Sequence, residues 1–166
     1  MIRLNAEPLT AEAFAPFGDV IAAGGDGYIE INEGMARRYH DLAKVDVLAE
    51  GGRPLISIFR ARPWFRPICL RVMERHPLGA QAFIPMHGDS FLVVVAPAGP
   101  APAPSDLRAF VTDGRQGVNY ARGTWHHPLL ALDRIGDFLV VDRGGDGHNL
   151  DEIDYRHHDV AVVVPT

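Results

Sequence analysis

Short apolar segments, separated by glycine and proline residues, run along most of the chain. Most of them are about five to nine residues long, which is the usual length of β-strands and short for helices. Residues 10–17 are the exception and predict a short helix, with Thr10 as its N-cap and Pro16 and Gly18 at its end. Strands are expected at residues 19–22, 28–32, 37–43, 55–61, 67–76, 81–86, 91–96, 107–112, 124–130, 137–142 and 160–164.

So many short strands in 166 residues favour an all-β barrel or sandwich, in a single domain that spans residues 1–166. Residues 97–104, with the sequence PAGPAPAP, form a low-complexity stretch. The segments on either side are too short to close separate cores. We therefore expect this stretch to be a surface loop within one domain and not a linker between two.

Composition and charge narrow the class of protein. Hydrophobic residues make up 47% and charged residues 22% of the chain, which indicates a soluble globular protein and excludes a disordered, collagen-like or coiled-coil one. The 16 Lys and Arg against 21 Asp and Glu give a net charge of −5. This balance argues against a general nucleic-acid surface but allows a small basic pocket for an anionic metabolite.

The sequence pattern indicates neither a membrane span nor an export signal. The longest apolar run, residues 91–98, is far shorter than the roughly 20 residues of a membrane-spanning helix. Glu7 and Pro8 stand where a signal peptide has its apolar stretch. The single cysteine, Cys69, can form no internal disulfide and is expected to be a small core residue. We therefore expect a cytoplasmic protein.

The expected strand at residues 67–76 places an acid and an imidazole on one face. Alternation along a strand puts Glu74 and His76 on the same side as the apolar residues Ile68, Leu70 and Val72. This pattern is expected where the interior of a barrel opens into a polar mouth. The alternative is a strand that leaves the core for solvent.

Two further segments supply polar residues for the same interior. A Pro-Leu-Gly turn follows His76, so the next strand returns antiparallel and brings Gln81 near His76. His126 and His127 are adjacent on a later strand, so their side chains point to opposite faces and at most one of them shares the interior. His126 is the better candidate, because Thr124 and Leu130 lie on its face.

These spacings resemble the motifs of the cupin superfamily, G(X)5HXH(X)3-4E(X)6G and G(X)5PXG(X)2H(X)3N. Glu74 stands in the place of the first His of the first motif, and Gln81 in the place of its Glu. Residues 123–126 follow part of the second motif. The resemblance implies a double-stranded, jelly-roll type β-barrel with a divalent metal held by four residues, Glu74, His76, Gln81 and His126.

The character of these four residues leaves two interpretations open. Two imidazoles with oxygen donors suit an octahedral ion such as Ni²⁺, Mn²⁺ or Fe²⁺ that keeps positions open for a substrate. In the metal-free alternative, Glu74 and Gln81 hydrogen-bond across the hairpin while the histidines orient the substrate.

The chain is more closely similar to the bacterial ureidoglycolate lyases, over nearly its whole length. The strings that carry this resemblance are RYHDLA at 38–43, ERHPLG at 74–79, QAFIPM at 81–86, GVNY at 117–120, WHHPL at 125–129 and DRGG at 142–145. The resemblance implies a homodimer that cleaves (S)-ureidoglycolate into glyoxylate and urea in allantoin breakdown, with nickel as the implied cofactor. The proline-rich loop and His148, His157 and His158 depart from the family pattern.

Cleavage of ureidoglycolate needs a base for its hydroxyl group and an acid for the departing urea nitrogen. Imidazoles suit both tasks near neutral pH, and the candidates are His76, His126 and His127. Candidate residues that bind the substrate are Arg38, His40, Asn119 and Arg143. Each of them also has a structural alternative: an interface or a solvated face for Arg38 and His40, a turn for Asn119, and an Asp142–Arg143 pair for Arg143. Functional alternatives are an amidohydrolase that releases ammonia, a non-catalytic barrel that binds a small organic acid, and a barrel oxygenase or isomerase.

Overall fold

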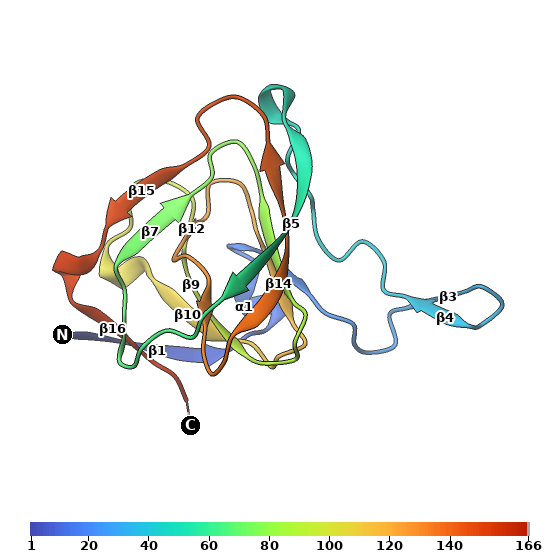
Figure 1. Ribbon diagram of the computed structural model, residues 1–166, viewed down its shortest axis with the longest axis horizontal. Coiled ribbons are helices and arrows are strands. Elements are labelled where there is room, and N and C mark those ends of the chain that lie inside the picture. The colour runs from blue at the N-terminus through green and yellow to red at the C-terminus, as the bar shows by residue number, and fades with distance from the viewer. Residues whose placement is uncertain (166) are drawn as a thin grey trace.

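A computed structural model describes residues 1–165, which form many strands and few helices (Figure 1). The strands are β1 (Ile2–Pro8), β2 (Gly18–Ile21), β3 (Ile29–Ile31), β4 (Ala36–Arg38), β5 (Arg53–Ala61), β6 (Ile68–Cys69), β7 (Val72–Arg75), β8 (Gln81–Pro85), β9 (Phe91–Ala96), β10 (Arg108–Val111), β11 (Gly117–Tyr120), β12 (Trp125–His126), β13 (Leu130–Ala131), β14 (Gly136–Gly144), β15 (Asp151–Asp154) and β16 (Val160–Val163). The helical elements of the described chain are α1 (Ala11–Phe14) and the 3-10 turns η1 (Ala49–Gly51), η2 (Pro104–Asp106) and η3 (Arg156–His158).

Two curved sheets form a half-barrel around the core (Figure 1). The larger sheet has the order β15-β7-β12-β9-β10-β1-β16-β6, with β13 also paired to β9, and the smaller sheet has the order β2-β11-β8-β14-β5. Strand β9 lies centrally and is buried on both faces, because its side chains alternate between two hydrophobic clusters. The expected all-β architecture is therefore present.

The short helix forms where the sequence predicts it. The Thr10 hydroxyl accepts a hydrogen bond from the backbone N–H of Ala13, which caps the first turn. The helix buries Phe14 against Phe17 and Phe110. Within residues 1–165, no helix is long and apolar enough to cross a membrane.

Several strands depart from the expected boundaries. β1, β11 and β15 were not expected as strands, and the strand expected at residues 37–43 ends at Arg38. The strand expected at residues 67–76 is divided, because the chain changes partner there. The N–H of Leu70 donates to the carbonyl of Val160 in β16, whereas the N–H of Arg71 donates to the ring of His127, which follows β12.

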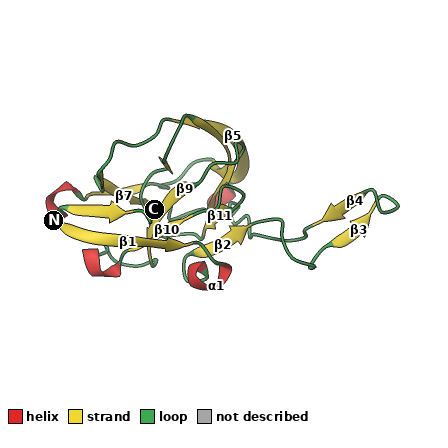
Figure 2. Ribbon diagram, turned by 90° about the horizontal axis from the view of Figure 1, so that it is seen from below, coloured by secondary structure: helices red, strands yellow, loops and turns green. Residues whose placement is uncertain are grey.

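The β3–β4 hairpin projects from the half-barrel as an arm, and the two views of the molecule agree on this (Figures 1 and 2). It is a separate two-stranded sheet, with Ile29 opposite Arg38 and Ile31 opposite Ala36. The base of the arm is fixed to the body where the Asn119 amide donates to the carbonyl of Lys44. The arm is therefore held at its base while its strands extend away from the core.

A buried tyrosine holds the proline-rich loop in place. The Tyr155 hydroxyl donates to the carbonyl of Pro102, and burial raises the pKa of this phenol to about 12. A phenol with a raised pKa in the folded state contributes stability below its unfolded pKa of about 10, and this contribution is lost as the pH rises through the folded value. We expect Tyr155→Phe to lower the free energy of unfolding by about 1 kcal/mol at pH 8 and to flatten its decline between pH 8 and pH 11.

Urea unfolding at the two pH values measures both effects. Tyr28→Phe, a change to a half-buried tyrosine of the arm, serves as the control and should leave the slope unaltered. An equal decline in the Tyr155→Phe variant and the unmodified chain would contradict the assignment.

Candidate active site

Two neighbouring strands bring a carboxylate and two imidazoles together. Glu74 in β7 lies directly opposite His126 in β12, and His76 follows the end of β7. The imidazole centroids of His76 and His126 are 5.2 Å apart. One ligand atom from each of these three residues lies within 4.8 Å of the other two. They form a compact cluster, here called the Glu74 cluster, that can hold protons or a metal ion.

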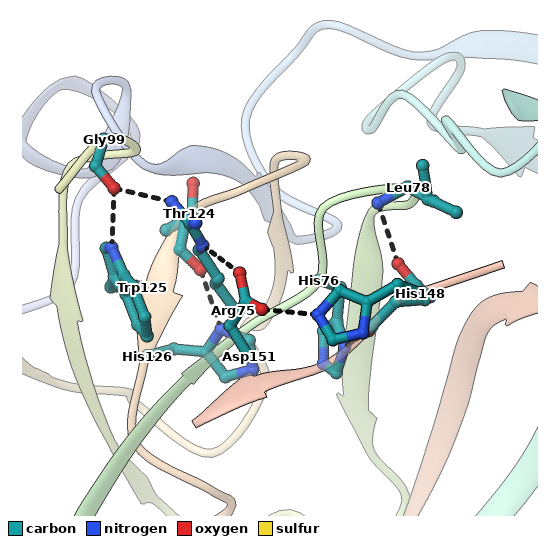
Figure 3. A network of polar contacts seen from close by, with 10 residues as sticks. Arg75, His76, Leu78, Gly99, Thr124, Trp125, His126, His148 and Asp151 are labelled. Carbon is teal, nitrogen blue, oxygen red and sulfur yellow. Dashed lines mark hydrogen bonds and ion pairs between the residues drawn. The ribbon is translucent and has the colours of Figure 1, made fainter. Parts of the chain in front are cut away.

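Backbone carbonyls orient both imidazoles. Figure 3 shows the contact between His126 and Thr124. The Nδ1 atom of His126 lies 3.0 Å from the carbonyl oxygen of Thr124, and the Nδ1 atom of His76 lies 2.8 Å from that of Asn149. Because a carbonyl oxygen can only accept, each Nδ1 carries a proton and donates it. In the neutral imidazoles, each Nε2 therefore presents a lone pair.

Both Nε2 atoms face oxygen atoms. The Nε2 of His126 is 3.3 Å from Glu74 Oε1, and the Nε2 of His76 is 3.1 Å from Gln81 Oε1. The Nε2 of His126 is buried without a hydrogen-bond partner. A proton on Nε2, or a cation between the groups, turns these contacts between lone pairs into favourable ones. Imidazoles that donate from one nitrogen to a carbonyl and offer the other nitrogen beside a carboxylate are typical metal ligands, so the residues fit a divalent ion.

A half-buried carboxylate, that of Asp142, holds Gln81 in place. The Nε2 atom of Gln81 donates to Asp142 Oδ2 over 3.2 Å, so its own carbonyl oxygen turns toward His76. The second oxygen of Asp142 is buried without a hydrogen-bond partner. Sequence analysis missed Asp142 as a site residue. The signal was available, because Asp142 alternates on one face of β14 with the fully buried Phe138 and Val140.

The electrostatics of the cluster favour a charged carboxylate beside a neutral phenol. Burial raises the pKa of Glu74, but its contact with His126 and the attraction of the nearby imidazoles outweigh burial, so the pKa lies below its usual value. Tyr120 stacks on His126 with ring centroids 4.2 Å apart. Burial and, second, the charge of Glu74 raise the pKa of Tyr120, which keeps the phenol protonated. Sequence analysis missed Tyr120 because GVNY does not read as a strand.

A cavity of about 370 Å³ opens beside the cluster. Its lining combines Glu74 and Gln81 with the aromatic rings of Phe59 and Phe83. Within the described chain, Arg60 is the one cationic side chain of this lining, and its guanidinium donates two hydrogen bonds to Asp137. The cavity can hold a small polar molecule close to the imidazoles.

The family model for ureidoglycolate lyase matches residues 1–163. The chain belongs to the ureidoglycolate lyase family. Among its relatives named ureidoglycolate lyase, the protein from Burkholderia mallei (strain NCTC 10229) is 59% identical over 152 residues, 92% of this chain and 89% of the relative. The protein from Pseudomonas aeruginosa (strain LESB58) is 57% identical over 165 residues, 99% of this chain and 98% of the relative.

Solved structures confirm the barrel architecture of this ureidoglycolate lyase family member. The structure of RmlC from Streptococcus suis in complex with dTDP-D-xylose superposes with a TM-score of 0.52 and 13% sequence identity. The match covers 87% of this chain and 74% of that chain. The likeness concerns the fold alone, and it agrees with the predicted cupin-like barrel.

His127 lies outside the Glu74 cluster. Its Nδ1 donates to the carbonyl of Pro128, its Nε2 accepts a hydrogen bond from the N–H of Arg71, and its ring packs edge-on against Trp64. Burial lowers the pKa of His127, in keeping with a neutral ring that donates and accepts once. In this member of the ureidoglycolate lyase family, His127 therefore packs against Trp64 and does not contact the Glu74 cluster.

Asn119 and Arg143 are buried, and their hydrogen bonds lie away from the Glu74 cluster. The Asn119 amide donates to the Asp19 carboxylate as well as to Lys44, in a strand and not in the turn considered from the sequence. The Arg143 guanidinium donates to the backbone carbonyls of four residues, Ala49, Glu50, Gly145 and Asp146. The Asp142–Arg143 pair considered from the sequence is absent among the ion pairs of residues 1–165, and Asp142 faces Gln81.

Arg38 and His40 lie on the projecting arm. Arg38 ends β4 and His40 follows two residues later, and both are exposed. Their own chain does not bring them to the cavity beside the cluster, whose lining contains neither residue.

Loss of the Asp142 charge is expected to disturb the cluster through Gln81. Because residues that orient metal ligands typically contribute about 10- to 100-fold in metal affinity or activity, we expect Asp142→Asn to lower the affinity for a divalent ion by this factor. Titration of the metal-free protein with nickel, followed by calorimetry, measures the change. Asp133→Asn, at an exposed carboxylate, is the matched control. Equal nickel affinities in the two variants would exclude a positioning role for Asp142.

Proposed function

We propose that this protein is a lyase that cleaves (S)-ureidoglycolate into glyoxylate and urea in allantoin breakdown, part of purine catabolism. The observation that carries the proposal is the convergence of two imidazoles, each with its Nε2 directed into one cluster with Glu74, in a ureidoglycolate lyase family chain. Its single cysteine, Cys69, fits work in a reducing cytoplasm.

The reaction is an elimination that the cluster can carry out with proton transfers alone. A base accepts the proton of the substrate hydroxyl, the oxygen forms a double bond to carbon, and the carbon–nitrogen bond breaks with its electron pair on nitrogen. An acid protonates that nitrogen, so urea leaves and glyoxylate remains. One imidazole of the pair His76 and His126 serves as the base and the other as the acid.

Glu74, His76 and His126 would hold a divalent metal ion, with Gln81 as a neutral fourth donor. Bound there, the ion would supply Lewis acidity to the carboxylate and hydroxyl groups of the substrate and would lower the pKa of the hydroxyl. The surrounding chain keeps water from the ring of His126, which is 1% exposed. Nickel is the ion that we propose, with manganese and iron as the alternatives.

Product analysis tests the proposed reaction. The purified protein, incubated with (S)-ureidoglycolate, should release one urea for each glyoxylate. Ammonia in place of urea would identify an amidohydrolase. Binding of glyoxylate in calorimetry, without turnover of ureidoglycolate, would identify a non-catalytic protein that binds an organic acid.

Metal removal is expected to lower both the lyase rate and the thermal stability. A ligand that binds the folded state at 100 times its Kd stabilises that state by about 2.7 kcal/mol, so chelation followed by dialysis should lower the melting temperature as well as the rate. Nickel or manganese should restore both. A full rate in protein shown by elemental analysis to contain no metal would instead support catalysis by the histidines alone.

A further inference from the structure

The projecting arm has one face that its own chain does not cover. Cross-strand pairing puts Ile29, Ile31, Ala36 and Arg38 on the same face of the hairpin. The side chains of Ile29 and Ile31 are 51% and 36% exposed, and Met35 at the tip is 86% exposed. The opposite face has internal partners, since Tyr28 packs on Tyr39. Arg38, a cation, is the last residue of β4 on the exposed apolar face, and His40 follows two residues later.

An isolated two-stranded hairpin of this kind has little stability of its own in water. Two strands without a third strand or a packed face are marginally stable at best, and the arm pairs with no other strand in the described chain. Its base is nevertheless well fixed, because Asn119 and Asp19 hold the backbone of Lys44. A fixed base with an uncovered apolar face is expected for a segment that packs on another molecule.

The same chain carries a surface that complements the arm. Strand β5 is the edge of the smaller sheet and pairs only with β14 among the described strands. Three of its apolar side chains, Ile56, Ile58 and Phe59, are 77%, 53% and 40% exposed. A long, apolar, unpaired edge is a site for strand addition. One molecule thus offers both an unpartnered arm and an unpartnered edge.

The edge strand β5 also forms part of the wall of the cavity beside the Glu74 cluster. Phe59 and Arg60 of β5 line the cavity beside Glu74, and Asp142 lies behind Gln81. Asp137 already pairs with Arg60, so the lining adds no free guanidinium to balance these carboxylates and the carboxylate of the substrate. Arg38 and His40 follow the apolar face of the arm, just as the cavity lined by Glu74 follows the apolar side chains of β5.

We propose that the β3–β4 arm of one copy docks along β5 of a second copy and that Arg38 and His40 complete the second copy's cavity. The contact is reciprocal, as a two-fold dimer requires: each copy gives its arm and receives its partner's. Arg38 binds the carboxylate of the substrate through its guanidinium. The docking is inferred from the exposed side chains of the arm and of β5. The role of Arg38 in substrate binding rests in addition on the proposed lyase function.

Covalent capture tests the docking without any enzymatic assay. A photo-crosslinking amino acid at position 31, on the apolar face, should attach to residues 53–61 of the other copy when labelled and unlabelled copies are co-purified. The same probe at position 30, on the opposite face, should attach much less. Crosslinks confined within one copy, or absent from β5, would overturn the docking whatever the protein's activity.

Complementation tests the role of Arg38. Arg38→Ala is expected to lower kcat/KM about 10- to 100-fold, since a hydrogen bond to a charged group contributes that much, and His126→Gln removes an imidazole of the cluster. A heterodimer of the two variants, purified through two different tags, has one complete site only if the arm acts on its partner, and should show about half the wild-type rate. A heterodimer as inactive as its parents would show that Arg38 acts within its own chain.

Two other results have separate meanings. An unimpaired Arg38→Ala homodimer would exclude the residue from substrate binding. A wild-type protein that crosslinks but has no lyase activity would refute only the proposed function.

Discussion

Replacing His126 with glutamine is expected to lower kcat about 10²- to 10⁴-fold, the usual contribution of one general acid–base group. Glutamine occupies a similar volume and places its amide near the position of Nε2, but it has no nitrogen that exchanges protons near neutral pH. The fold should persist, because Tyr120 keeps an adjacent side chain to pack against. Steady-state kinetics and circular dichroism measure the two effects.

The neighbouring residue supplies a matched control. His127 is equally buried, yet its ring packs on Trp64 away from the Glu74 cluster. His127→Gln should therefore reduce the free energy of unfolding by about 1–3 kcal/mol through its lost hydrogen bonds, while kcat changes little. A loss of kcat as large as that of His126→Gln would mean that the cluster has been assigned to the wrong imidazoles.

Truncation of Phe110 is expected to have the largest effect on stability. The ring is fully buried and contacts Phe14 and Phe17, with ring centroids 5.7 Å and 6.1 Å away. Phe110→Ala removes this burial and leaves a cavity under α1, which costs about 3–5 kcal/mol. Urea unfolding followed by tryptophan fluorescence measures the loss.

Phe65→Ala is the control for this change. Phe65 has the same side chain but is 88% exposed, so its removal should alter the free energy of unfolding by no more than about 0.5 kcal/mol. A similar small loss in Phe110→Ala would show that the aromatic cluster around α1 does not stabilise the fold.

Strand alternation placed Glu74 and His76 on one face and chose His126 over His127, and the structure brings Glu74, His76 and His126 together. The predicted apolar part of that face is different, because Ile68 and Leu70 pack in the same hydrophobic cluster as Met73, the neighbour of Glu74. The catalytic role of the three residues stays a prediction. The same rule, applied to β14, would have separated Asp142 from Arg143 and directed only the acid inward. Arg143 needs no acidic partner, because backbone carbonyls accept the hydrogen bonds of its guanidinium.

Long-range pairing accounts for the strands that sequence did not predict. β1 pairs in parallel with β10 and β16, more than a hundred residues away, so its identity depends on partners that no local window contains. β11 contains Gly117 and Asn119, which favour turns, but Asn119 is satisfied by Asp19 in the neighbouring strand. The two strands of the projecting arm were expected, at residues 28–32 and 37–43, but a hairpin pattern does not specify what the hairpin packs on, so its projection from the body was not predicted.

The loop after β14 orients an imidazole of the Glu74 cluster through its backbone. The carbonyl of Asn149 orients His76, and Arg143 ties the same loop to η1 through carbonyls. None of these acceptors belongs to a side chain, so substitutions of Asp146 and His148 should be compatible with an oriented His76. Gly145 and Gly147 are different, because their φ angles of +118° and +104° favour glycine. Insertion or deletion of a single residue there would shift the register of every carbonyl, so natural or engineered change must preserve the length of the loop and its two glycines.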